Sequence, residues 1–179
     1  MQHLRPSRRI ITPRRVAGAL ALAAVAAPVA ATGAPRTVED SRHLWATVNV
    51  CDTARWPDTI GVRGSMPGSA DGSETMWMRF RVQFLSTADD RWHNVPEGGD
   101  SGFVYVGRAH FKARQAGRSF RISPKIGDRV LLRGKVTFEW RRRGEVVRRA
   151  SMRTRRGHRS SAGADPPGYS AATCTITRG

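Results

Sequence analysis

The chain has 179 residues, with 31 Lys and Arg against 14 Asp and Glu, and so carries a formal net charge of +17. Hydrophobic residues make up 39% of it, which excludes a protein with many membrane spans but is enough for one ordinary domain and a processed leader. Two cysteines cannot by themselves form a four-cysteine zinc site or an iron–sulfur cluster. Composition alone identifies no biochemical activity.

Residues 1–31 have the pattern of a secretory signal peptide. Residues 1–15 contain five arginines and no acid, an apolar run follows from Val16 to Ala27, and small residues place the cleavage after Ala31. Ser7-Arg8-Arg9 resembles the start of a twin-arginine signal, so the export route stays open. An uncleaved anchor is the alternative, although a spanning helix needs about 20 apolar residues. We expect a protein that is secreted or held on the extracellular face of the cell envelope.

Residues 32–43 are polar and predict a linker, and from residue 44 to 179 the pattern is that of an all-β domain. Apolar and polar residues alternate over 46–50, 60–66, 76–84 and 129–141, which indicates strands with one buried face. Shorter strands are expected at 102–106, 119–123, 145–154 and 170–177. Seven or eight strands with frequent turn residues are typical of a β-sandwich or barrel. The predicted core comprises Val48, Val50, Ile60, Val62, Met78, Phe80, Val82, Phe84, Val130, Leu132, Val136, Phe138 and Trp140.

The two cysteines lie at opposite ends of this domain. Cys51 follows the first predicted strand and Cys174 lies in the last one. In an oxidising compartment an even pair usually forms a disulfide, which would join the two strands. Two buried free thiols are the alternative.

Three stretches together resemble a known group of proteins. They are residues 48–68 with Cys51, the 138–150 segment with Phe138-Glu139-Trp140, and the 168–176 tail with Cys174. They are similar to small exported proteins of high-GC Gram-positive bacteria that have an immunoglobulin-like β-sandwich and paired end cysteines. The group has no assigned activity, so the resemblance implies an immunoglobulin-like fold and export only.

Positive charge is concentrated in one part of the domain. Residues 129–159 contain twelve basic and two acidic residues, a net +10 out of the +12 carried by residues 32–179. A hairpin of 129–141 and 145–155 with its turn at Arg143-Gly144 would hold them, but the sequence leaves open whether the two strands present their arginines on one face. The predicted anion-binding residues are Arg141, Arg142, Arg143, Arg148, Arg149 and Arg153.

Such a cluster favours an anionic partner, by attraction and counterion release. The candidates are an anionic cell-wall polymer or lipid headgroups, and a protein partner is a further candidate. No helix-turn-helix, zinc-finger or RNA-recognition pattern accompanies the charge, so specific nucleic-acid binding is not favoured. Trp77 falls on the polar face and could stack on a ligand, whereas Trp140 falls on the apolar face and predicts a core role. The alternative is that the arginines are a solvated surface that blocks edge association in a structural or protein-binding module.

The sequence gives little support for catalysis. Gly99-Asp100-Ser101-Gly102 resembles part of the nucleophile motif of chymotrypsin-like proteases, but neither His43 nor His93 has the surroundings of the catalytic histidine. The mature histidines have no metal-ligand spacing. We expect no enzyme activity, cofactor or metal. The remaining alternative is a hydrolase in which the fold brings His93 or His110 to Ser101.

Overall fold

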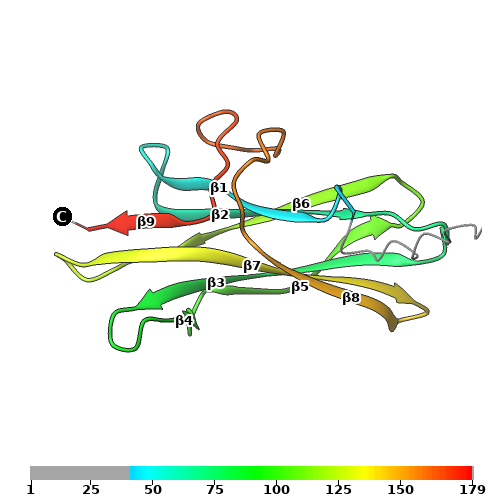
Figure 1. Cartoon of the computed structure of the whole chain (residues 1–179), viewed down its shortest axis with the longest axis horizontal. Coiled ribbons are helices and arrows are strands. Elements are labelled where there is room, and N and C mark those ends of the chain that lie inside the picture. Colours follow the sequence, from blue (N-terminus) through cyan, green and yellow to red (C-terminus); the bar gives the residue numbers. More distant parts are fainter. Residues whose placement is uncertain (1–40, 179) are drawn as a thin grey trace, which may run out of the picture. The chain divides into compact units, whose positions relative to one another are not determined.

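Two antiparallel β-sheets build the part of the chain that the structure, a computed structural model, describes, residues 41–178 (Figure 1). One sheet has the strand order β1-β2-β6, and the other has the order β4-β3-β7-β8, with β5 also on β3 and β9 also on β7. The strands are β1 (Trp45–Thr53), β2 (Trp56–Pro67), β3 (Thr75–Ser86), β4 (Arg91–Asn94), β5 (Asp100–Arg108), β6 (Ala113–Arg121), β7 (Arg129–Arg142), β8 (Glu145–Arg153) and β9 (Cys174–Thr177). The predicted all-β sandwich is confirmed, with nine strands instead of seven or eight.

The predicted signal peptide, residues 1–31, and residues 32–40 of the predicted linker lie outside the described residues. Residues 41–43 form a turn into β1, closed by a hydrogen bond from the Leu44 N–H to the Ser41 carbonyl (2.8 Å). Within residues 41–178 there is no helix with the length and apolar character that crossing a membrane requires.

The six-stranded sheet has two long central strands, each with two short partners along its outer edge. Ser86 to Gln83 of β3 pair with β4, and Arg81 to Thr75 pair with β5. On β7, residues 129–132 pair with β9 and residues 135–142 pair with β8. The edge of β7 therefore changes partner between Leu132 and Lys135.

The core lies between the two sheets, as the alternating pattern predicts. Apolar side chains of β3 and β7 point inward, and Phe80, Phe138 and Trp140 are among its largest buried members. Every predicted core residue is buried except Phe84 and Val130, which are half-buried at the margin of the core. Both lie near the end of the domain where β7 begins, so they close the core there.

Gly134 of β7 packs closely against the opposite sheet. A Cβ atom at this position would lie 2.6 Å from Val62 of the opposite sheet and 2.7 Å from the Thr154 methyl group, closer than packed carbon atoms come. The absence of a side chain here lets Thr154 reach the β7 backbone.

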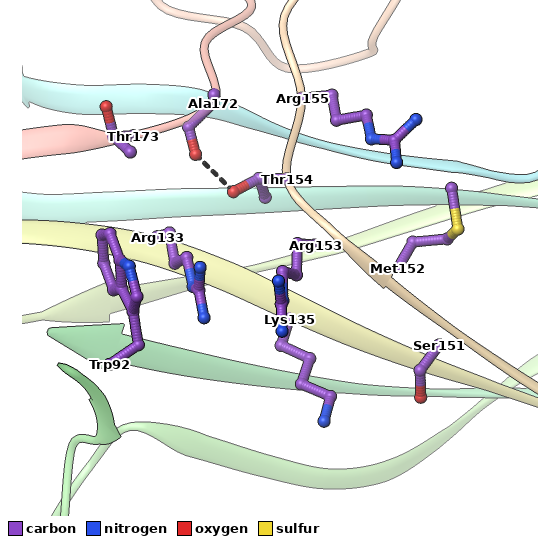
Figure 2. A pocket seen from close by; sticks show the side chains of 10 residues that line it. All are labelled: Trp92, Arg133, Lys135, Ser151, Met152, Arg153, Thr154, Arg155, Ala172 and Thr173. Carbon is purple, nitrogen blue, oxygen red and sulfur yellow. Dashed lines mark hydrogen bonds between the residues drawn. The ribbon is translucent and has the colours of Figure 1, made fainter. Parts of the chain in front are cut away.

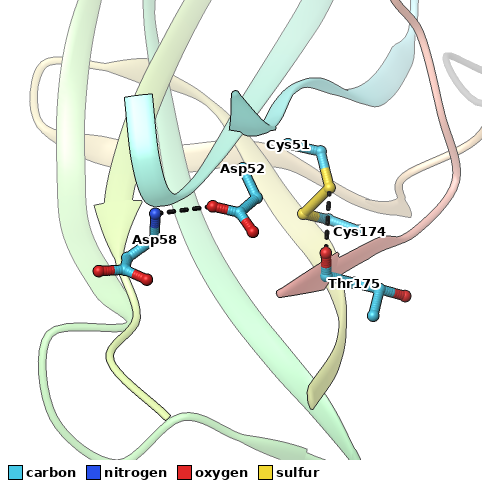
Figure 3. Close-up of a disulfide and its surroundings, with 5 residues drawn as sticks. All are labelled: Cys51, Asp52, Asp58, Cys174 and Thr175. Atoms are coloured by element: carbon cyan, nitrogen blue, oxygen red, sulfur yellow. Dashed lines mark hydrogen bonds between the residues drawn. A yellow bond between two sulfur atoms is a disulfide. The ribbon is translucent and has the colours of Figure 1, made fainter. Parts of the chain in front are cut away.

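A disulfide joins Cys51 of β1 to Cys174 of β9, with the two Cα atoms 5.4 Å apart (Figure 3). It links the first strand to the last and one sheet to the other, so the predicted pairing is confirmed. Beside it, the Asp52 carboxylate accepts a hydrogen bond from the Asp58 N–H (2.8 Å), which closes the β1–β2 turn. The disulfide therefore fixes β9, which pairs with the start of β7, to β1.

The segment between β8 and β9 runs along the free edge of β1 (Figure 1). The Arg155, Asp165 and Ala171 N–H groups donate to carbonyls of Ala46, Asn49 and Val48 at 2.8–3.0 Å. This segment covers an edge that would otherwise offer unpaired backbone groups. It then returns to the six-stranded sheet at Ala172 and Thr173.

Candidate functional site

The arginine-rich region is a long β-hairpin, as predicted, with its turn at Arg143-Gly144. Both turn residues have positive φ (51° and 89°), the conformation of the tight hairpin turn whose twist matches the strands. The register pairs Lys135 with Arg153 and Glu139 with Arg149. Directly paired residues point to the same side of a sheet, so β7 and β8 present these side chains on one outer face, and the question that the sequence left open is resolved.

Four of the six predicted anion-binding arginines contact acids inside the chain. Glu139 is 1% exposed and forms ion pairs with Arg141 and Arg149, both at 2.6 Å. Glu74 is 4% exposed and contacts Arg142 at 3.0 Å and Arg148 at 2.5 Å. Because both acids are buried, these arginines neutralise them and thereby support the fold. We call this set the tip cluster: Arg141, Arg142, Arg148 and Arg149 with Asp71, Glu74 and Glu139, where Asp71 is a second partner of Arg142.

The two tryptophans of the hairpin region differ in role. Trp140 is 1% exposed and its indole N–H donates to the Pro67 carbonyl (3.0 Å), so the predicted core role is confirmed. Trp77 is half-buried on the outer face, with the Arg141 guanidinium 4.6 Å from its ring centre and Tyr105 packed beside it. Part of the stacking surface expected of Trp77 is thus already covered by the chain itself.

A groove opens at the point where β7 changes partner from β8 to β9. The Gly134 N–H donates to the Thr154 hydroxyl (3.0 Å), and that hydroxyl donates to the Ala172 carbonyl (2.5 Å; Figure 2). Thr154 therefore replaces the strand pairing that is missing at this seam. The resulting groove has a volume of about 620 Å³.

Four cationic side chains line this groove, and no acidic one does. Figure 2 shows them on β7, on β8 and just beyond it, together with Trp92 of β4. We call it the cationic groove and define it by Trp92, Arg133, Lys135, Met152, Arg153 and Arg155. Within residues 41–178, none of its four cations forms an ion pair.

Arg133 is a half-buried cation of the groove that is held by neutral neighbours. Its guanidinium lies 4.1 Å from the centre of the Trp92 ring, and its Nε donates to the Gln83 side-chain oxygen (2.9 Å). Burial lowers the pKa of Arg133, and repulsion from Arg153 lowers it further. The guanidinium stays charged, because its pKa starts far above neutral pH, but it is held beside a like charge with only neutral contacts.

Of the six predicted anion-binding arginines, Arg153 alone lines the cationic groove. Arg153 lies in the cationic groove, and Arg143 stands exposed in the turn with no acidic partner among the described side chains. The sequence identifies Arg133, Lys135 and Arg155 as cations on the polar faces of their strands. That they line one groove depends on the change of β7's partner from β8 to β9. Trp92 was missed because β4 has only four residues, too few for a clear alternation.

The residues of the alternative hydrolase site have other partners. The Ser101 hydroxyl donates to the Gly102 carbonyl (2.7 Å) and accepts from the Phe80 N–H (2.9 Å), so it supports the local backbone. His93 contacts the Asp89 carboxylate at 2.8 Å. Arg79 forms a two-pronged pair with Asp100, and this bond is the main cause of the lowered pKa of that carboxyl. No group of His, Cys, Asp and Glu in the described region is arranged to hold a metal ion.

Comparison with known proteins adds no assignment, because no protein-family model matches the chain and no curated protein matches it in sequence.

Proposed function

We propose that this protein is an exported, non-catalytic binding module of the cell envelope that contacts an anionic partner through the cationic groove. One observation carries the proposal: Arg133, Lys135, Arg153 and Arg155 line one groove, and no acid within residues 41–178 forms an ion pair with them. Holding like charges together costs free energy, and an anion in the groove would offset that cost.

The chemistry of the groove suits phosphate or carboxylate groups. Guanidinium groups offer planar forks of N–H donors that match such oxyanions, and Lys135 adds a mobile ammonium. Apolar surface from Trp92 and Met152 lies beside these donors, as in binding sites where an uncharged part of the ligand also makes contact.

Export is supported by the signal-peptide pattern of residues 1–31 and by the disulfide. A disulfide between Cys51 and Cys174 persists in oxidising compartments and is rare where thiols are kept reduced. An anionic cell-wall polymer or lipid headgroups would be the partners available there.

The test is co-sedimentation of the purified full-length protein with insoluble cell-wall material and with vesicles containing phosphatidylglycerol, at low and high salt. We expect binding at low salt that falls steeply as salt rises. Replacing Arg153→Gln should weaken it about tenfold, the effect of losing one charge-assisted hydrogen bond. Arg143→Gln removes the same charge from the hairpin turn and should change binding less than twofold. Absence of binding at low salt, or equal loss in both variants, would contradict the proposal.

A structural or protein-binding module is the second candidate, and the tip cluster favours it. There the arginines satisfy buried Glu74 and Glu139, a role that needs no external ligand. If the groove arginines were only surface charges, Arg153→Gln would leave every interaction of the protein unchanged.

A further inference from the structure

A second, smaller pocket lies beside the cationic groove on the same outer face. Its volume is about 230 Å³, and it is lined by Arg79, Arg81, Phe103, Thr137, Arg149 and Ser151. Ser151 also lines the cationic groove, so the two depressions adjoin at this residue. We call this second depression the small pocket.

Arg81 contributes one of the three guanidinium groups of the small pocket. Its Nε atom is buried and has no hydrogen-bond partner among the described residues. Because this atom is closed to solvent, a ligand oxygen in the pocket would contact the terminal N–H groups of the same guanidinium. Neighbouring Arg79 and Arg149 are oriented by Asp100 and Glu139, yet each guanidinium has five N–H donors and keeps some free for a ligand.

Cations continue from the small pocket into the groove along one row of the sheet. The register pairs Arg81 of β3 with Lys135 of β7, and Lys135 with Arg153 of β8. Neighbouring strands are about 4.8 Å apart, so three cations stand side by side over about 10 Å. Like charges directly opposite each other are unfavourable in a sheet, and here two such pairs follow in succession.

Donors approach the small pocket from several directions. The Thr137 and Ser151 hydroxyls lie 3.1 Å apart and hydrogen-bond to each other; Thr137 is on β7, the strand next to the one that carries Arg81, and Ser151 is on β8 beyond it. A tetrahedral oxyanion can accept bonds from all these sides at once, whereas the two oxygens of a carboxylate lie in one plane with their carbon.

On these grounds, and resting on the proposed function, we propose that the ligand is a linear phosphate polymer that crosses the strands, with one phosphate in the small pocket and others in the cationic groove. Two adjoining subsites favour a polymer over a single anion, because a second group binds from a high local concentration once the first is held. A membrane surface is the alternative that this arrangement does not favour, since Arg79, Arg81, Arg133 and Lys135 are all half-buried and not projecting.

The proposal is tested by calorimetric titration of the full-length protein with orthophosphate, tripolyphosphate and long-chain polyphosphate at low salt. Affinity per chain should rise by more than tenfold from orthophosphate to the long chain. Arg81→Gln should weaken long-chain binding about tenfold and should also weaken the binding of orthophosphate. Arg118→Gln, which removes an exposed arginine from β6 of the other sheet, is the matched control and should change neither.

Ser151→Glu provides a second variant at a position whose own side chain is exposed. It places a negative charge between the two subsites. It should therefore also abolish the rise in affinity from orthophosphate to long-chain polyphosphate. Far-ultraviolet circular dichroism and unfolding midpoints confirm that both variants are folded.

The outcomes separate this inference from the proposed function. One outcome is that Arg81→Gln and Ser151→Glu bind long chains as the wild type does while Arg153→Gln loses binding. In that case anion binding in the cationic groove is supported, and the proposal that a polymer extends into the small pocket is wrong. Equal affinity for poly-L-glutamate and polyphosphate overturns the preference for phosphate. Tight binding to phosphatidylglycerol vesicles together with weak binding to polyphosphate identifies a membrane surface instead. If no anion binds at low salt, both proposals fail.

Discussion

The same hairpin carries arginines in two opposite electrostatic states. In the tip cluster near the turn, four arginines surround two buried glutamates and Asp71. In the cationic groove, where β8 ends and β9 begins, four cations converge without an acid among the residues that line it. The cations of both regions lie on the same two strands or, for Arg155, just beyond β8, so the difference comes from the residues that each cation faces.

This contrast separates structural charge from charge available for binding. An arginine that neutralises a buried carboxylate is already engaged, and its removal leaves an uncompensated charge in the protein. A groove cation such as Arg153 pairs with no acid within residues 41–178 and lies beside like charges, so its removal relieves repulsion and, under the proposed function, costs a ligand contact. Charge density along the sequence, which is high in both regions, does not distinguish them.

The largest expected effect concerns the disulfide that closes the groove side of the domain. Replacing both Cys51 and Cys174 by Ala should lower the free energy of unfolding by about 4 kcal/mol, because the bond closes a loop of 123 residues in the unfolded chain. Urea unfolding measures this change in the free energy of unfolding. Amide exchange should accelerate at Thr154 and Thr173 of the groove more than at Glu139 of the tip cluster. Unchanged stability, or faster exchange at the tip alone, would contradict this.

Breaking the tip cluster should be the next largest effect. Glu139→Gln replaces two charge-assisted contacts, to Arg141 and Arg149, by neutral ones and should cost about 1.5 kcal/mol of unfolding free energy. Glu145→Gln is the matched control, because Glu145 is an exposed acid of the same hairpin, and it should cost less than about 0.5 kcal/mol. Equal losses in the two variants would mean that the buried pairing does not stabilise the tip.

His158 should report on whether an anion occupies the groove. It stacks on Trp45 with ring centres 4.5 Å apart, and burial, followed by repulsion from Arg155, lowers its pKa below the ordinary 6.5. The unfolded chain therefore binds the proton more readily, and stability should fall as the pH drops through 6.5. A phosphate polymer in the groove should offset the charge of Arg155 and raise the pKa of His158.

Nuclear magnetic resonance titration of the His158 ring, with and without polyphosphate, measures this shift. Arg155→Gln should raise the pKa in the same direction without any ligand. A His158 titration that polyphosphate leaves unchanged would place the ligand away from Arg155.

Much of the fold could be predicted from the sequence, because a strand with one buried face repeats its apolar residues at every second position. The alternation in 76–84 and 129–141 identified β3 and β7, and the paired cysteines identified the link between the ends. β4 was not predicted, because four residues of which three are exposed and polar show no alternating pattern. Arg143-Gly144 predicted the hairpin turn. The register of β7 against β8, which pairs Lys135 with Arg153, is known only from the structure.

The site was less predictable for a physical reason. Whether an arginine is paired depends on contacts that are distant in sequence: Glu74 reaches Arg148 across 74 residues. Likewise, the groove needs Trp92 from β4, Arg133 from β7 and Thr173 from the approach to β9. Counting charges along the sequence therefore located the cationic region. It could not identify which of its arginines and lysines have no acidic partner within residues 41–178.

The most direct test of the central claim is the sign of the stability change at low ionic strength in two variants of β8. Arg153→Gln removes a groove cation that faces Lys135, and it should raise the free energy of unfolding by about 0.3 kcal/mol. Arg148→Gln removes a partner of buried Glu74 and should lower it by about 1 kcal/mol or more. Opposite signs are the predicted result. If both variants lose stability to the same extent, the groove cations are compensated like the others, and the account is contradicted.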